Sequence, residues 1–172
     1  MPNTFELISA VTVGSGGAAS IDFTSIPSTY TDLFLKYSLR SDRAGQNNDA
    51  LFLKINNNMT SLSTRLLEGD GSSAASYSTS STTTKSGSVT GSTATSSTFA
   101  NGEIYLPNYA GNTNKSYSGD GVTENNATSA ISLLAAGLWS DTAAINQLTL
   151  VSGYGTKLVE HSTAYLYGVS NA

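Results

Sequence analysis

Few side chains in this sequence could carry acid–base or nucleophilic chemistry. His161 is the single histidine of the 172 residues, and the chain has no cysteine. A hydrolase needs a nucleophile, a base and an orienting acid within reach of one another. Glu160 and Ser162 flank His161 in an expected strand and point to its opposite face, so neither can orient the imidazole ring. The lack of cysteine excludes a disulfide framework, a thiolate nucleophile and a cysteine-ligated zinc site.

Carboxylates could support glycoside hydrolysis or calcium binding. A glycosidase needs two Asp or Glu residues at a set separation. Most acidic residues here lie beside expected turns, where an Asp side chain bonds the local backbone. Residues 68–72 and 118–121 offer oxygen ligands, but neither segment completes a calcium loop with its closing glutamate. We therefore expect two ordinary turns, no enzymatic activity, no catalytic residue, and neither a metal nor a cofactor.

The charge balance and the hydropathy point away from nucleic acid and membranes. Lys and Arg total 8 against 12 Asp and Glu, which gives a net charge of −4. Dispersed cations on an acidic chain do not make a phosphate-binding footprint. The longest apolar run, residues 130–139, is about half the length that spans a bilayer. Residues 1–6 lack the features of a secretory leader. We expect a soluble protein made in a cytoplasm, without nucleic-acid or membrane partners.

The elements that must position these residues are short β-strands. Apolar residues recur with a period of two over most of the chain, most clearly at Leu33, Leu35, Tyr37 and Leu39. Residues 130–139 fit a helix or a strand, and we favour a buried strand because the neighbouring segments are all β. The other expected strands are 5–13, 19–23, 33–40, 50–55, 103–106, 145–151 and 158–169. About eight strands predict one all-β domain over residues 1–172, a single antiparallel β-sandwich of jelly-roll-like form.

Residues 71–98 form a long Ser/Thr-rich excursion from this sandwich. Of these 28 residues, 19 are Ser or Thr. The composition is typical of a flexible loop, although Thr and Val also suit a long β-hairpin. We favour a third interpretation, in which the excursion is held by contact with a neighbouring chain. The candidates for contacts with other subunits or with a larger assembly are Phe5, Leu7, Tyr77 and Val89.

The tyrosine-rich loop 105–117 could bind sugars. Aromatic rings can stack on a sugar face, and amides can hydrogen-bond its hydroxyls. The candidate glycan-facing residues are Tyr105, Asn108, Tyr109, Asn112 and Tyr117. The alternative is an ordinary tight corner at residues 107–111 whose tyrosines pack on the end of the sandwich. Composition does not separate these two interpretations.

Several stretches along the whole chain carry a family resemblance. They are residues 19–33, 104–116, 124–128, 137–139 and 162–169. Together they resemble virion structural proteins of tailed phages that infect aquatic bacteria, cyanophages and similar marine phages among them. The resemblance extends from about residue 3 to residue 170 and is weakest across 71–98. It implies a virion component and carries over no active-site residue.

We therefore expect a non-enzymatic phage virion structural protein, located in the virion and assembled in the host cytoplasm. A capsid decoration or cement protein, which binds the assembled head and stabilises it, is the function that we favour. Its expected partners are further copies of itself, as a trimer, and the major capsid protein or another virion protein. The alternative is a head-displayed, tail or fibre domain that adsorbs to host surface glycans.

Overall fold

Strands form where the sequence alternates between apolar and polar residues. The computed structural model describes residues 4–126 and 130–170. In β3 (Asp32–Leu39), the inward side chains of Leu33, Leu35, Tyr37 and Leu39 are almost fully buried. Successive side chains of a strand point to opposite faces, so each strand has one core face and one outward face.

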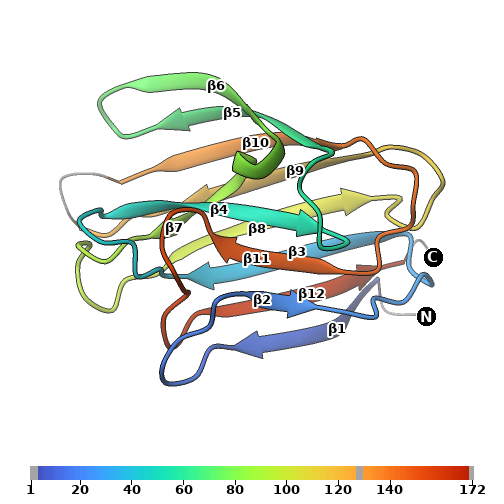
Figure 1. The fold of residues 1–172 in the computed structure, drawn as a ribbon, viewed down its shortest axis with the longest axis horizontal. Helices are drawn as coiled ribbons and strands as arrows, with labels where there is room; N and C mark the ends of the chain where they lie inside the picture. Colours follow the sequence, from blue (N-terminus) through green and yellow to red (C-terminus); the bar gives the residue numbers. More distant parts are fainter. Residues whose placement is uncertain (1–3, 127–129, 171–172) are drawn as a thin grey trace.

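The described strands form two antiparallel sheets that face each other (Figure 1). The larger sheet has eight strands in the order β1-β12-β3-β8-β9-β10-β5-β6, and the smaller has four in the order β2-β11-β4-β7. Besides β3, the larger sheet contains β1 (Phe5–Thr12), β12 (Thr163–Val169), β8 (Ala100–Pro107), β9 (Lys115–Val122), β10 (Ser132–Trp139), β5 (Leu62–Gly69) and β6 (Ala74–Ser80). The smaller sheet contains β2 (Ile21–Phe23), β11 (Leu148–Ser152), β4 (Asn48–Ile55) and β7 (Lys85–Thr90). A single 3₁₀ turn, η1 (Ser81–Thr83), joins β6 to β7 in the described chain.

Strand pairing is nested. β5 pairs with β6, β4 with β7, β3 with β8 and β2 with β11, so four antiparallel pairs lie one inside another along the chain. Successive pairs alternate between the two sheets. β9 and β10 link β8 to β5, while β1 and β12 extend the other side of β3. The all-β antiparallel sandwich expected from the sequence is confirmed.

Tyr37 occupies the core between the sheets. A Cβ atom added to Gly87 of β7, Gly102 of β8 or Gly121 of β9 would overlap its hydroxyl group. That hydroxyl donates a hydrogen bond to the Asp120 carbonyl at 3.4 Å, and burial raises the pKa of Tyr37. The three glycines therefore give space to one large side chain, which packs against strands of both sheets.

The Ser/Thr-rich segment 71–98 is part of the sandwich. β6 pairs with β5 and β7 pairs with β4, so each strand finds its partner outside the segment. The flexible loop and the self-contained hairpin are both wrong. Further along, the Arg40 guanidinium donates hydrogen bonds of 2.8–3.1 Å to four carbonyl groups. These acceptors belong to Ser92, Ala94, Thr95 and Thr98. Contacts within the chain are thus sufficient to hold the segment.

All eight expected strands overlap observed ones, but β5, β6, β7 and β9 were not expected. Residues 130–139 do contain a strand, β10, yet only its inward side is buried. Leu134 and Leu138 on its other side are 58% and 39% exposed. The prediction of a buried strand was therefore wrong for one face, and that face belongs to the surface described next.

Candidate interaction surface

Most of the exposed large apolar side chains lie on the outward side of the eight-stranded sheet, which we call the outer face. An antiparallel sheet with one side on the core usually turns polar residues outward. Here the outward positions include many apolar residues instead. They are Phe5, Leu7, Leu67, Tyr105, Val122, Leu134, Leu138 and Tyr165. The outer face is thus apolar where solvent contact alone would favour polar groups.

Strand register gathers one set of these residues, the aromatic cluster, across four neighbouring strands. Leu7 lies opposite Tyr167, Tyr167 opposite Phe34, and Phe34 opposite Tyr105. The Phe34 ring makes edge contacts with Phe5 and Tyr105, with ring centroids 5.8 Å and 6.5 Å apart. Edge-to-face geometry is favourable for aromatic pairs. These five side chains form a continuous patch over β1, β12, β3 and β8.

Asp32 fixes the end of this patch. The Tyr105 hydroxyl donates to one Asp32 oxygen at 2.6 Å, and that bond raises the pKa of Tyr105. The other Asp32 oxygen accepts the Asn108 backbone N–H at 2.8 Å. The carboxylate therefore positions both the exposed tyrosine and the turn that follows β8.

A row of charges crosses the middle of the outer face. Lys36 lies opposite Glu103, and Glu103 lies opposite Asp120 on the next strand. The Lys36 ammonium is 3.4 Å from Glu103, an exposed pair that contributes little to stability. Burial and the negative charge of the Glu103 side chain raise the pKa of Asp120. A hydrogen bond with the Glu103 backbone and the positive charge of Lys36 act in the opposite direction but do not cancel the rise. Two carboxylates share one lysine, so this row would favour a cationic side chain from a partner.

A second apolar set, the aliphatic cluster, comprises Leu67, Leu134 and Leu138. Leu134 lies opposite Leu67, and both are more than half exposed. Small neighbours such as Ser118 and Ala136 leave shallow hollows around Leu134, one of them of about 360 Å³. Two smaller hollows, of about 180 and 230 Å³, also include Leu134 in their lining. Protruding leucines beside open hollows can interlock with a surface of complementary shape.

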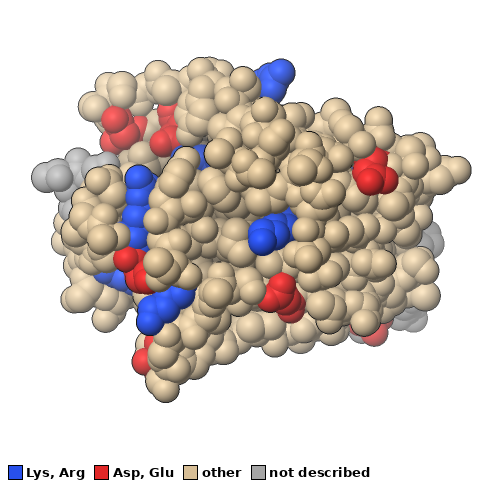
Figure 2. All heavy atoms as spheres, in the orientation of Figure 1, with Lys and Arg blue, Asp and Glu red and all other residues tan. Residues whose placement is uncertain are grey.

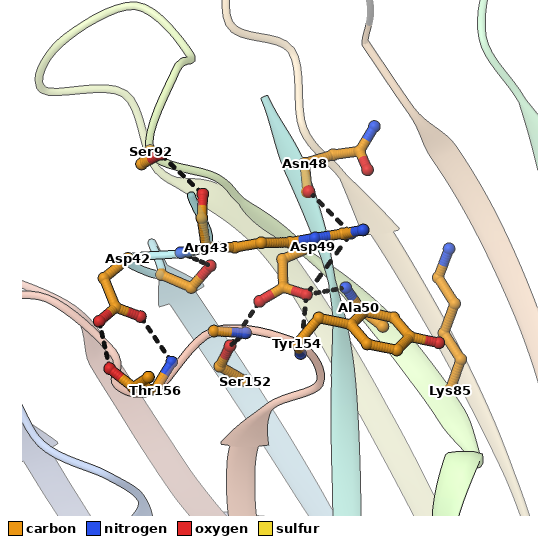
Figure 3. A network of polar contacts seen from close by, with 12 residues as sticks. Asp42, Arg43, Asn48, Asp49, Ala50, Lys85, Ser92, Ser152, Tyr154 and Thr156 are labelled. Carbon is orange, nitrogen blue, oxygen red and sulfur yellow. Dashed lines mark hydrogen bonds and ion pairs between the residues drawn. The ribbon is translucent and has the colours of Figure 1, made fainter. Parts of the chain in front are cut away.

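A polar network at one end of the sandwich is explained by the chain itself. The buried Asp49 carboxylate accepts the N–H groups of Ala50 at 2.8 Å and Tyr154 at 3.2 Å, and also the Ser152 hydroxyl. Arg43 lies 3.7 Å from the same carboxylate and 4.7 Å from the centre of the Tyr154 ring (Figure 3). These contacts join segments far apart in sequence, so the network serves the fold.

The predicted glycan-facing loop is wrong at two of its three candidate tyrosines. Tyr109 is fully buried and donates its hydroxyl to the Pro27 carbonyl. Tyr117 is 3% exposed, and its hydroxyl lies 2.8 Å from the Ser86 hydroxyl. Burial raises the pKa of Tyr117 to about 12. Asn108 and Asn112 are exposed around a tight turn, as in the corner alternative. With Tyr109 and Tyr117 in the core, the sugar-stacking platform is lost.

The four residues expected to make subunit or capsid contacts lie in different places. Phe5 and Leu7 are each more than half exposed on the outer face, and Tyr77 on β6 is 37% exposed. Val89 is fully buried in the core, so its predicted contact role is wrong. The sequence did not show that β7 is covered by β8, β9 and β10.

The side chains considered for acid–base chemistry and metal binding do not come together in one catalytic or metal-binding site. His161 is exposed in a turn with φ +70°, not within the final strand as predicted. Asp70 accepts the N–H groups of Ser73 and Ser72, which lower its pKa within the expected turn. Residues 118–121 lie within β9, so the second expected turn is wrong. Within residues 4–126 and 130–170, no group of three or more His, Cys, Asp or Glu residues could hold a metal ion.

Two further findings concern membrane-spanning helices and similarity to known proteins. None of the described helical segments is long and apolar enough to cross a membrane. No protein-family model matches the chain, and no curated protein matches it either. The fold and the outer face are therefore the basis for a functional proposal.

Proposed function

We propose that this protein is a non-enzymatic structural protein of a tailed-phage virion, and specifically a capsid decoration or cement protein. It binds the assembled head through the outer face and, by binding the assembled shell but not its separated subunits, stabilises the shell by mass action. The observation that carries this proposal is the outer face itself, where aromatic and aliphatic clusters are exposed on a sheet whose other side packs the core.

The size of the outer face supports a stable protein contact. Eight strands about 4.8 Å apart and about eight residues long, at about 3.3 Å per residue, cover on the order of 1,000 Å². Specific protein interfaces bury about 800 Å² on each partner. This footprint includes the charge row, and the two apolar clusters occupy part of it. Contiguous apolar patches on the surface of a soluble protein typically mark an interaction site.

The fold supports the same class of function. Nested pairing of β2 with β11, β3 with β8, β4 with β7 and β5 with β6 supports a jelly-roll form for this sandwich. Viral capsid proteins share that architecture with lectins and cupins. The sequence resemblance to phage virion proteins favours the first of these classes. Charged side chains are also few and scattered over the face of the molecule seen in Figure 2.

The charge row indicates which kind of side chain on the head surface would complement this part of the outer face. Glu103 and Asp120 carry two negative charges beside one lysine, so the head would place a Lys or Arg side chain against them. Complementary charges across an interface contribute mainly to specificity and to the association rate, and salt screens their long-range attraction. The apolar clusters would then supply most of the binding free energy, which salt does not remove.

Binding to empty heads of the parent phage tests the proposal. We expect saturation at a fixed number of copies per head and a higher melting temperature of the saturated head. Incubation with host cells in parallel tests the glycan alternative. Protein that leaves heads unbound but pellets with host cells would overturn the decoration role in favour of adhesion.

A further inference from the structure

β6 is an open edge of the eight-stranded sheet. Within the described chain it pairs with β5 alone and ends the strand order (Figure 1). The pairing runs without a register shift from Ser63 opposite Ser80 to Gly69 opposite Ala74. Residues 71–84 contain no charged residue and no proline. Natural sheets usually blunt an exposed edge with charges, proline, a bulge or a short strand, because an open edge pairs with other chains.

The other sheet edges in the described residues have such protection. β1 has a register shift between Leu7 and Ser9. β2 is only three residues long. β7 is largely buried and lies against β8, β9 and β10. Among the edges that the structure describes, β6 alone is long, regular and uncharged.

We propose that β6 pairs with β6 of a second copy of this chain, antiparallel about a two-fold axis. A two-fold interface uses the same patch on both subunits, so the contact closes as a dimer. This dimer replaces the trimer that we expected from the sequence. The pairing goes beyond the proposed function and does not depend on head binding.

Backbone geometry and the length of β6 together select the register of this pairing. In the turn between β5 and β6, the Asp70 N–H donates to the Ser73 carbonyl at 3.1 Å. The alternation of an antiparallel ladder then directs the backbone groups of Tyr77 toward β5 and those of Ser76 and Ser78 toward the free edge. Several two-fold registers pair these free groups, and the one that pairs β6 over its whole length, Ala74–Ser80, places Ser76 opposite Ser78 of the second copy. Tyr77 then lies on the axis, opposite its own counterpart.

The surroundings of Tyr77 suit a position on the axis. Its ring is 37% exposed, and its hydroxyl donates to Glu68, which also binds the Lys85 ammonium at 2.5 Å. The ring is therefore held by its own chain before pairing, which lowers the cost of ordering it. Residues directly opposite each other in a non-hydrogen-bonded pair have Cβ atoms about 5 Å apart, close enough for two aromatic rings to contact.

The dimer has a consequence for the outer face. A two-fold axis between antiparallel strands runs perpendicular to the sheet, so the outer faces of both copies point to the same side. A flat partner could then be bound by both copies at once, with the gain in affinity that two linked contacts provide.

Disulfide trapping tests the register, because the natural chain has no cysteine. Tyr77→Cys places two thiols opposite each other, so we expect most of this variant to become a cross-linked dimer under mild oxidation. Ala75→Cys lies on the same side of β6, but its counterpart would be about 13 Å away, four residues along the strand. We expect this control to stay reduced. Equal cross-linking of the two variants would overturn the register.

Sedimentation tests the pairing without altering Tyr77. We expect the wild-type protein to be a dimer and Ser76→Pro to be a folded monomer with an unchanged circular-dichroism spectrum, because proline removes an N–H that β5 does not use. A monomeric wild-type protein, or a dimer that survives Ser76→Pro, would overturn the proposal. Head binding of the Ser76→Pro monomer, measured separately, keeps this result distinct from failure of the decoration role.

Discussion

The two sheets differ in how far the chain covers the apolar side chains on their outward sides. On the four-stranded sheet, Ala50 and Phe52 point outward yet are at most 7% exposed. The chain covers them itself, with the Tyr154 ring in edge contact with Phe52 at 5.7 Å. On the eight-stranded sheet, Leu67 and Leu134 are 53% and 58% exposed. This sequence can therefore cover outward apolar groups, and it leaves them open on one face, as a surface kept for a partner requires.

The largest effect expected from this contrast is on stability. Phe52→Ala should lower the free energy of unfolding by about 3–4 kcal/mol, because it removes a buried ring and leaves a cavity. Leu134→Ala should lower it by less than about 0.5 kcal/mol, because the side chain is already in water. Chemical denaturation of both variants measures the difference. Similar losses for the two would mean that the two faces do not differ as described.

The next effect concerns the segment that the chain holds for itself. Arg40→Ala should cost about 2 kcal/mol, since charge-assisted hydrogen bonds to four carbonyls are lost. It should also expose residues 92–98 to proteolysis. Arg65→Ala on the outer face is the matched control and should leave both properties unchanged. Resistance of the Arg40 variant to protease would show that other contacts hold the segment.

A smaller effect follows from uncovering the four-stranded sheet. Tyr154→Ala should cost about 1 kcal/mol, the contribution of one aromatic pair. It should also increase binding of a hydrophobic dye, because Phe52 becomes accessible. Tyr154→Phe keeps the ring and should behave like the wild-type protein in both measurements. If Tyr154→Phe lost as much stability as Tyr154→Ala, the hydroxyl and not the ring cover would be responsible.

The smallest effect concerns the charge row. Burial and the like charge of Glu103 raise the pKa of Asp120, so its ionised form opposes folding. A carboxyl with a raised pKa destabilises the folded state increasingly as pH rises through that pKa, and not below the ordinary aspartate pKa of about 3.9. Asp120→Asn should therefore stabilise the protein by about 0.5 kcal/mol at neutral pH.

Unfolding titrations of Asp120→Asn at several pH values test this sign. The gain over the wild-type protein should shrink as the solution is made acidic. A gain that persisted at acid pH would point to packing or hydrogen bonding at residue 120 in place of charge repulsion.

The sequence predicted the strand faces better than it predicted which faces are covered. The two-residue period is a property of the extended backbone, so the inward side of β3 could be read directly. The inward side of β9 could not be predicted in this way, because it includes Lys115, Gly119 and Gly121. Such residues do not mark a core face in the sequence, and they are buried only because side chains from other strands pack on them. One of these packing partners is Tyr37, which comes from a distant part of the chain.

The candidate surface was missed for a related reason. Residues 132–139 are mostly apolar on both sides of the strand, which favoured a buried strand, but a single strand does not reveal whether a loop lies over its outward side. Phe5 and Leu7 were identified because they lie in the first expected strand. Val89, Tyr109 and Tyr117 were misplaced because their burial depends on contacts with distant segments.

The affinity of outer-face variants for empty heads tests the central claim most directly. Leu67→Ser with Leu134→Ser removes the two most exposed residues of the aliphatic cluster, and Val151→Ser on the four-stranded sheet is a control of similar chemistry. We predict that the double variant keeps the wild-type melting temperature and raises the Kd for heads at least about tenfold, whereas the control binds like the wild-type protein. Equal affinity of the double variant and the wild-type protein would contradict the assignment of the outer face as the binding surface.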